Sequence, residues 1–233
     1  PSPDRQSARL IRVLDWKTPG LGRNIVAARV TAPAGRYLTL TWPGYTGVLS
    51  AVAPGRFAVA LNQAPMRKAV GFFYLDWAAN RRRVWNMPHP TPAHLLRSVC
   101  NEAASFNDAV RRLSDEAIST PAIYSIAGTG TEETAVIERS ETEARVHRGV
   151  QVAANHWQAH GWTGHARGGD SAGRARMMAG IAADLDTDFG WLRDPVLNPR
   201  TRLAMVADAG TGQLTAQGFE HEKPATAVLR LDV

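Results

Sequence analysis

Five polar residues stand where apolar stretches of the sequence end, and their side chains could serve one reaction centre. They are Arg12 and Asp15 in LIRVLDW, Asn62 in FAVALNQ, Asn155 in VQVAANHW and Arg174 in DSAGRARMM. Apolar runs that stop at a hydrogen-bonding side chain are typical of a rigid sheet that presents functional groups at its edge. A carboxylate, two guanidinium groups and two amides can orient a nucleophile and stabilise an oxyanion, but none of them is a nucleophile.

Each of these residues also has a structural interpretation. Arg12 could pair with Asp15 along one extended segment, and both asparagines could be turn residues, the commonest role of Asn after a strand. Arg174 is the hardest to assign, because Arg176 is two residues away and the loop HGWTGHARGGD could shift the alignment. We favour a shared site because all five residues occur together with the motifs between them.

The elements that would position these residues follow from the hydrophobic pattern. An antiparallel meander of strands is predicted from RLIRVLDW, GRYLTLTW, TGVLSAV and RFAVALN, which are separated by turn signals. Three helices are predicted next, at 66–83, at about 91–103 with Thr91 and Pro92 at its start, and after a capping box formed by Ser105 and Asp108. The last two helices should pack together over a sheet.

Strands are predicted again after Pro121, from AIYSIAG, TAVIER, EARVHR and VQVAANHW. Asp170 or Ser171 is expected to cap a helix that runs through MMAGIAADL. The chain then closes with strands at TRLAMVAD, GQLTAQ and TAVLRLDV. Strands, a helical middle and further strands indicate two sheets packed face to face with helices outside.

The composition favours one domain. The chain has 233 residues, of which 44% are hydrophobic and 21% are charged, which suffices for a sizeable core. It has no stretch of eighteen apolar residues, so no membrane-spanning segment is predicted, and PSPDRQSAR contains no signal-like apolar core. The single cysteine excludes an intrachain disulfide and favours a reducing, cytoplasmic location.

The basic charge does not indicate nucleic-acid binding. The net charge is +6, but only Arg81, Arg82 and Arg83 are contiguous, and lysine occurs three times. No helix-turn-helix, zinc-finger or RNA-binding pattern is present in the sequence. We therefore predict no nucleic-acid partner.

Two other reactive side-chain types have simpler interpretations. Cys100 lies among Leu95, Leu96 and Val99 on one predicted helix face, which is typical of a small core residue rather than a nucleophile. The spacing H-x3-H-x4-H at His156, His160 and His165 could hold zinc, but it lacks the Glu of a metalloprotease motif and contains two glycines. We predict no metal and no cofactor.

The order of the motifs resembles the N-terminal nucleophile (Ntn) hydrolases of the choloylglycine hydrolase, acid ceramidase and N-acylethanolamine acid amidase-like group. The similarity runs from about Arg9 to Arg174 and includes LIRVLDW, TWPGYTGVLSAVAPGRFAVALNQ, HLLRSVC, SFNDAVRRL, PAIYSIAG, AVIER and VAANHW in that order. The resemblance implies an α+β fold, a four-layer α/β/β/α sandwich of two mostly antiparallel sheets formed by residues 1–233 as a single domain. In that family the nucleophile is the N-terminal Cys of the mature chain, which would lie a few residues upstream of Pro1. We therefore expect the chain that begins at Pro1 to be inactive.

The resemblance also implies roles for the polar residues. The N-terminal Cys would supply the thiol and its own α-amine the general base. Asp15 would hold the α-amino group, while Arg12 and Arg174 would favour the thiolate. Asn62 and Asn155 would donate to the oxyanion.

The expected substrate is a small-molecule N-acyl amide, cleaved at a linear, nonpeptide C–N bond through a thioester acyl-enzyme. We predict that Trp16, Phe72, Phe73 and Trp77 contact the acyl group, because a lipid-like chain needs an apolar surface beside the polar groups. A catalytically silent binding protein on the same fold and an acyltransferase remain alternatives. We leave a homo-oligomer open.

Overall fold

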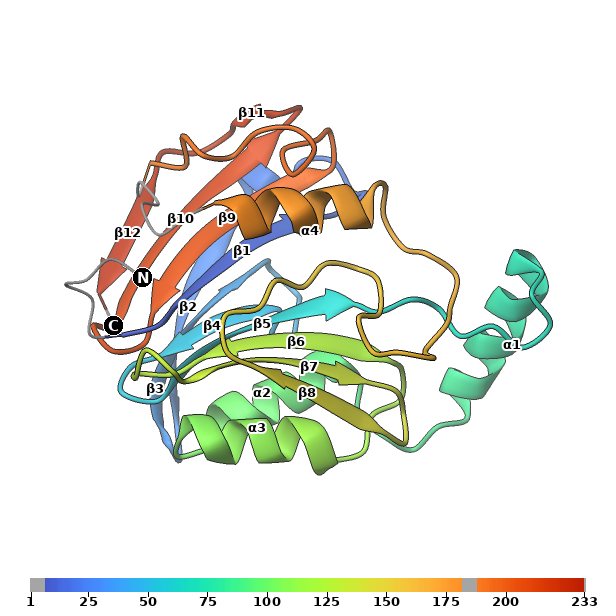
Figure 1. Ribbon diagram of the computed structural model, residues 1–233. Coiled ribbons are helices and arrows are strands. Elements are labelled where there is room, and N and C mark those ends of the chain that lie inside the picture. Colours follow the sequence, from blue (N-terminus) through green and yellow to red (C-terminus); the bar gives the residue numbers. More distant parts are fainter. Residues whose placement is uncertain (1–6, 182–187, 233) are drawn as a thin grey trace.

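The computed structural model describes residues 7–181 and 188–232, and within them two antiparallel sheets face each other (Figure 1). The seven-stranded sheet follows chain order: β2 (Val26–Ala32), β3 (Gly35–Thr41), β4 (Ser50–Ala53), β5 (Phe57–Gln63), β6 (Ala122–Ala127), β7 (Thr134–Arg139) and β8 (Ala144–Arg148). The five-stranded sheet contains β1 (Arg9–Asp15), β9 (Thr201–Asp208), β10 (Gln213–Glu220), β11 (Lys223–Pro224) and β12 (Leu229–Asp232). A short 3₁₀ helix (Leu21–Arg23) connects β1 to β2.

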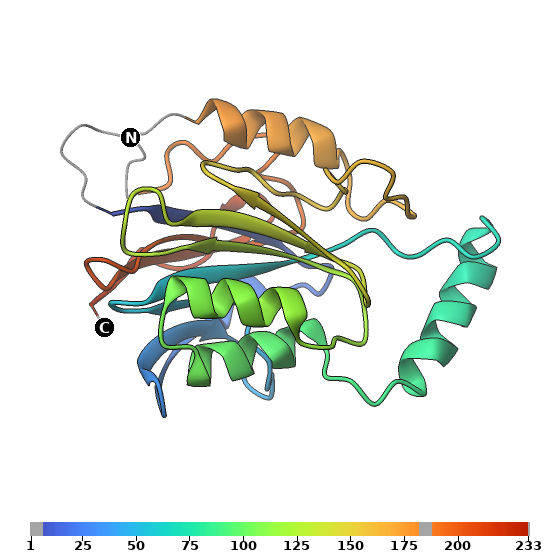
Figure 2. The same cartoon turned by 60° about the horizontal axis from the view of Figure 1, so that its bottom comes forward.

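Helices cover the outer faces of both sheets, which completes four layers. Helices α2 (Pro92–Glu102) and α3 (Phe106–Asp115) lie together over the seven-stranded sheet (Figure 2). Helix α4 (Ser171–Gly180) lies over β9 and β1 of the five-stranded sheet (Figure 1). Strand β1 shows why both faces are covered: Leu10 and Leu14 belong to the core between the sheets, whereas Ile11 and Val13 pack in a second cluster with Met177 of α4. The predicted α+β, four-layer α/β/β/α sandwich is confirmed.

The predicted caps of the helices are present. The Thr91 side chain accepts from the His94 N–H at the start of α2, and the Ser105 side chain accepts from the Asp108 N–H at the start of α3. Asp170, rather than Ser171, caps α4 by accepting from the Gly173 N–H. The continuation of this helix that we predicted through residues 182–185 lies outside the described residues.

Strand β1 is not part of the predicted meander. It pairs with β9 in the other sheet, and β2, which we did not predict, forms the first strand of the meander instead. The sequence of β2, VAARVTA, gives a weak signal because no side chain in this strand is fully buried.

Two further predictions were wrong. Residues 150–157 form no strand within the described chain. The backbone N–H groups that follow them, of Gln158 (2.6 Å) and Ala159 (2.7 Å), donate to the Glu138 carboxylate instead of to a neighbouring strand. The helix predicted at 66–83 begins only at Phe73 and ends at Trp85. Met66 instead forms a β-bridge with His165, and Gly71 adopts a left-handed φ of 88°.

This helix, α1 (Phe73–Trp85), stands apart from both sheets in Figures 1 and 2. In the described residues, no helix has the length and apolar character needed to cross a membrane.

Candidate functional site

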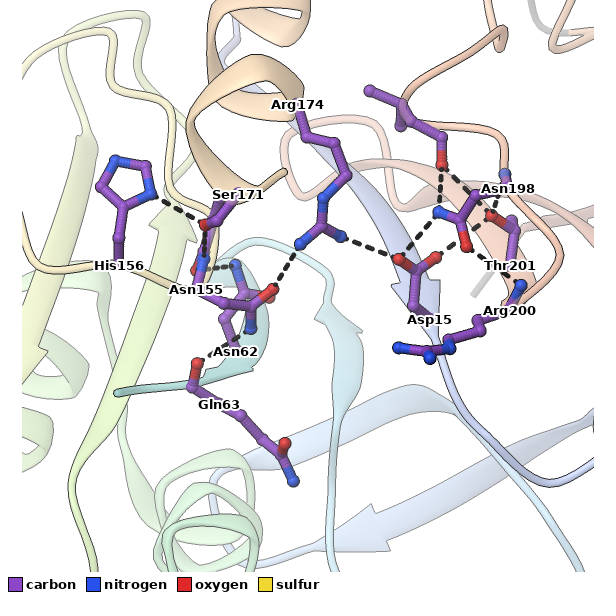
Figure 3. A network of polar contacts seen from close by, with 12 residues as sticks. Asp15, Asn62, Gln63, Asn155, His156, Ser171, Arg174, Asn198, Arg200 and Thr201 are labelled. Atoms are coloured by element: carbon purple, nitrogen blue, oxygen red, sulfur yellow. Dashed lines mark hydrogen bonds and ion pairs between the residues drawn. The ribbon is translucent and has the colours of Figure 1, made fainter. Parts of the chain in front are cut away.

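The Asp15 side chain lies at the centre of a polar network at the end of β1 (Figure 3). Its Oδ2 accepts from Arg174 Nη1 (2.8 Å) and from Asn198 Nδ2 (2.9 Å), and its Oδ1 accepts from Thr201 Oγ1 (3.1 Å). These donors come from α4, from the loop before β9 and from β9 itself. Segments more than 180 residues apart in sequence therefore meet at this carboxylate.

Arg174 connects Asp15 to Asn155. Its Nη2 donates to Asn155 Oδ1 at 3.1 Å. Because a guanidinium can only donate, the Asn155 oxygen must face Arg174, and its Nδ2 then donates to the Gln63 carbonyl at 2.8 Å. Arg174 thus orients the Asn155 amide so that its nitrogen faces Gln63, the last residue of β5.

Asn62 lies one residue before Gln63 and ties the same strand end to the loop that contains Asn155. Its Nδ2 donates to the carbonyls of Ala154 (3.1 Å) and Ala153 (3.3 Å). The amide protons that we expected to face an oxyanion are therefore directed at backbone carbonyls in this structure. A substrate oxygen would have to replace one of these acceptors.

Arg12 lies between the two sheets. Its side chain is only 6% exposed, and its Nη2 donates to the Leu61 carbonyl of β5 at 2.6 Å, beside Asn62. Burial lowers the pKa of Arg12 to about 10, an effect that the nearby Asp15 carboxylate opposes. The guanidinium therefore still carries its charge at neutral pH.

The loop 150–170 is fastened to α4 by residues that we did not single out as functional. Ser171 Oγ accepts from the Asn155 backbone N–H at 2.8 Å and contacts His156 Nδ1 at 2.8 Å (Figure 3). Gly168 packs against the Arg174–Asn155 pair with a φ of 73°, and a Cβ at this position would lie 2.7 Å from Arg174 Nη2. The paired glycines Gly168 and Gly169 are the sequence signal for such a close approach.

Asn198 and Thr201 are also site neighbours that sequence reasoning missed. They belong to the turn NPRT, in which the Asn198 N–H donates to Thr201 Oγ1 (3.0 Å) and the Arg200 N–H donates to Asn198 Oδ1 (2.9 Å). An Asn-Pro pair before an apolar strand indicates a turn, but it does not show which carboxylate the turn will face.

The four residues predicted to contact an acyl group are divided between two places. Trp16 follows Asp15, is partly buried, and lies with its ring 6.4 Å from the ring of Trp42. Phe72, Phe73 and Trp77 lie at the start of α1, about half exposed, on a helix that stands apart from the layers (Figure 1). The structure therefore does not unite them with Trp16 in one apolar surface.

Two pockets on the surface lie away from the Asp15 network. One, with a volume of about 340 Å³, is lined by loop residues that include Arg67, Glu141, Trp157 and Trp162. None of the five polar residues predicted for the site lines it. Asp15, Arg174 and Asn155 are joined by direct hydrogen bonds, and the side chains of Arg12 and Asn62 donate to backbone carbonyls beside them.

Cys100 is fully buried on α2, within the core formed with the seven-stranded sheet. Burial raises the pKa of its thiol to about 12, so it stays protonated. The three histidines have separate surroundings: His156 contacts Ser171, His165 pairs with Asp76, and His160 is exposed. Within the described ranges, no group of three side chains is placed to hold a metal ion.

Two solved structures show the same architecture. The Caenorhabditis elegans N-acylethanolamine-hydrolyzing acid amidase (NAAA) ortholog is similar over 87% of this chain and 88% of its own, with 20% identity and a TM-score of 0.64. The penicillin V acylase from Agrobacterium tumefaciens is similar over 98% of this chain and 83% of its own, with 14% identity and a TM-score of 0.50. This chain has the Ntn-hydrolase fold. Neither a family model nor a curated protein matches the sequence, so the likeness is one of fold.

Proposed function

We propose that the protein is a cysteine Ntn amidohydrolase that cleaves linear, nonpeptide amides and releases an amine from an N-acyl substrate. The observation that carries this proposal is the connected set Asp15, Arg174 and Asn155, which joins three distant segments at the end of β1. A fold shared with an N-acylethanolamine-hydrolyzing acid amidase and a penicillin V acylase supports it. The nucleophile in this proposal is an N-terminal Cys upstream of Pro1, since the thiol of Cys100 is buried and protonated.

The proposed reaction has two steps. The Cys sulfur attacks the amide carbon, its proton passes through its own α-amine to the leaving nitrogen, and the C–N bond breaks to leave a thioester and a free amine. Water then attacks the thioester carbon, the same α-amine accepts its proton, and the carboxylic acid and the thiol are released.

The network residues take complementary parts in this scheme. Asp15, held by Arg174 and by the turn NPRT, accepts a hydrogen bond from the α-ammonium group. Arg12 keeps a positive charge between the sheets that favours the thiolate. Asn155, oriented by Arg174, donates to the oxyanion through Nδ2, which donates to the Gln63 carbonyl when no substrate is bound. A single donor of this kind contributes about 3–4 kcal/mol in a well-studied hydrolase.

The test uses a chain extended by its own upstream residues so that a Cys is exposed at the N-terminus. We expect it to release amine from N-acyl amino acids, N-acylethanolamines or penicillin V, while the matched Cys→Ala protein and the chain that begins at Pro1 release none. Binding of these compounds without any turnover by the extended chain would overturn the proposal and favour a silent binding protein.

A further inference from the structure

Helix α1 contacts the rest of the protein through its polar side. Asp76, Asn80 and Arg83 recur at intervals of four and three residues, which places them on one helical stripe. Asp76 pairs with His165 (2.7 Å), Asn80 Nδ2 donates to the Arg67 carbonyl (2.9 Å), and Arg83 forms an ion pair with Glu141. An ordinary surface helix does the reverse and buries its apolar side.

Most large apolar side chains of α1 and of the turn before it are exposed, although the Phe73 ring also lies 5.5 Å from the His165 ring. These exposed residues are Val70 (70%), Phe72 (58%), Phe73 (47%), Tyr74 (69%), Leu75 (60%), Trp77 (49%) and Trp85 (79%). Most of the large apolar side chains exposed on the described chain belong to this one segment. Large apolar side chains gathered on one exposed segment point to an interaction surface.

The exposed charged side chains within residues 64–90 are positive, although Glu141 and Glu143 line a pocket together with Arg67. Arg67, Lys68, Arg81 and Arg82 are exposed, and Asp76, the one acidic residue between positions 64 and 90, is fully buried. The Arg81 guanidinium lies 5.5 Å from the centre of the Trp77 ring and 5.9 Å from a Trp85 ring. Cations and aromatic rings therefore alternate along one exposed side of the helix.

We propose that residues 67–85 dock this protein on an anionic lipid surface, with α1 lying in the plane of the interface. Aromatic and aliphatic side chains would enter the boundary between headgroups and acyl chains, and the arginines and Lys68 would bind the negative headgroups. A second copy of the chain fits less well, because a symmetric contact would bring Arg81 and Arg82 of both copies together.

The patch is also held in shape before any lipid binds. Asp76 accepts from the backbone N–H groups of Ala69, Val70 and Gly71 at 2.8–2.9 Å, which fixes the turn that presents Val70 and Phe72. Docking a preformed surface avoids the entropy cost of ordering a flexible one. The proposal does not depend on the proposed function, because it needs no catalytic group.

The experiment is co-sedimentation of the chain with vesicles of phosphatidylcholine alone or with added phosphatidylglycerol, at low and high salt. We expect binding to the anionic vesicles that weakens with salt. The variant Phe72→Ser/Leu75→Ser/Trp85→Ser should bind about tenfold or more weakly, since it removes three interfacial side chains. Arg81→Gln/Arg82→Gln should lose most of the preference for anionic vesicles, by about thirtyfold at about 1 kcal/mol for each arginine.

The matched control is Val26→Ser/Val150→Ser/Leu229→Ser, which removes three exposed apolar side chains elsewhere and should bind as the unchanged chain does. Circular dichroism should show the same fold in all variants. The proposal would be overturned if the unchanged chain did not bind the anionic vesicles. It would also be overturned if the α1 triple variant bound them as well as the unchanged chain does. Gel filtration that shows a dimer broken only by the α1 triple variant would also overturn it and assign the patch to a second copy.

Discussion

Two aspartates each organise a polar cluster in this protein, and they do so with different kinds of donor. Asp15 is bound by side chains, from Arg174, Asn198 and Thr201, and its own side chain is 23% exposed. Asp76 is fully buried and is bound by three consecutive backbone N–H groups and by His165.

The difference separates a structural carboxylate from a candidate catalytic one. Backbone donors in a turn cannot move without unfolding that turn, so the Asp76 cluster fastens α1 and has little room for a ligand. The donors of Asp15 are side chains from separate segments around a partly exposed carboxylate, and a ligand can be accommodated among them. Each cluster is centred on an aspartate, so the residue type at its centre does not distinguish the two.

The largest expected effect is on activity and comes from Asp15. In the extended chain with its N-terminal Cys, Asp15→Asn should lower kcat by about a hundredfold or more, because the α-amine and Arg174 lose their shared anionic partner. The measurement is steady-state amine release, with thermal melting as the control for folding. An Asp15→Asn enzyme with normal kcat would place Asp15 outside the reaction.

Asp76→Asn should affect the stability of the protein rather than its activity. Replacing the carboxylate weakens its bonds to the turn 69–71 and to His165, so we expect the melting temperature to fall by about 5 °C. The kcat of the extended chain should change little, since the Asp76 cluster does not touch the Asp15 network in the described residues. Loss of activity without loss of stability would remove the distinction between the two aspartates.

The Asp76 contribution to stability should also depend on pH. The backbone N–H group of Val70, then His165 and the neighbouring N–H groups, hold the pKa of Asp76 well below its usual range despite burial. Because the folded-state pKa is lowered, the contribution is complete above the unfolded-state pKa of about 3.9 and is lost as the pH falls below it. Melting curves from neutral to acidic pH should therefore converge for the unchanged chain and Asp76→Asn. A difference between them that persists at the lowest pH would contradict this assignment.

The smallest effect tests the packing of the Asp15 network. Gly168→Ala should lower kcat by about tenfold, because its Cβ would lie against Arg174 Nη2 and its φ of 73° disfavours a side chain. Gly169→Ala is the matched control, since a Cβ there has open space around it. Equal activities of the two variants would show that Gly168 does not position Arg174.

The sequence predicted the parts of the fold that local physics determines. The capped starts of α2 at Thr91 and of α3 at Ser105 were predicted, because capping and helical periodicity are local. The pairing of β1 with β9 was not predicted, because β9 lies nearly 190 residues away and nothing in LIRVLDW specifies a partner strand. Residues 150–157 looked like a strand, but the distant carboxylate of Glu138 takes the N–H groups that follow them.

The candidate site shows the same limit. The order of the motifs in the sequence predicted that Asp15, Asn155 and Arg174 share a site. In the structure Arg174 donates to both Asp15 and Asn155. Asn198 could not be found in this way, because a turn residue has no signature that names its distant partner. For Asn62, residue type suggested a free donor, whereas the irregular loop supplies carbonyls that accept from it.

The most direct test of the account is intact-mass and peptide mass spectrometry of the extended chain after brief incubation with an amide substrate. We predict a mass increase equal to one acyl group, located on the N-terminal Cys peptide, and much less of it in Asp15→Asn. No label should appear on the peptide that contains Cys100, whose thiol is buried and protonated. An acyl group on Cys100, or none anywhere while amine is released, would contradict the claim that the Asp15 network serves an N-terminal thiol.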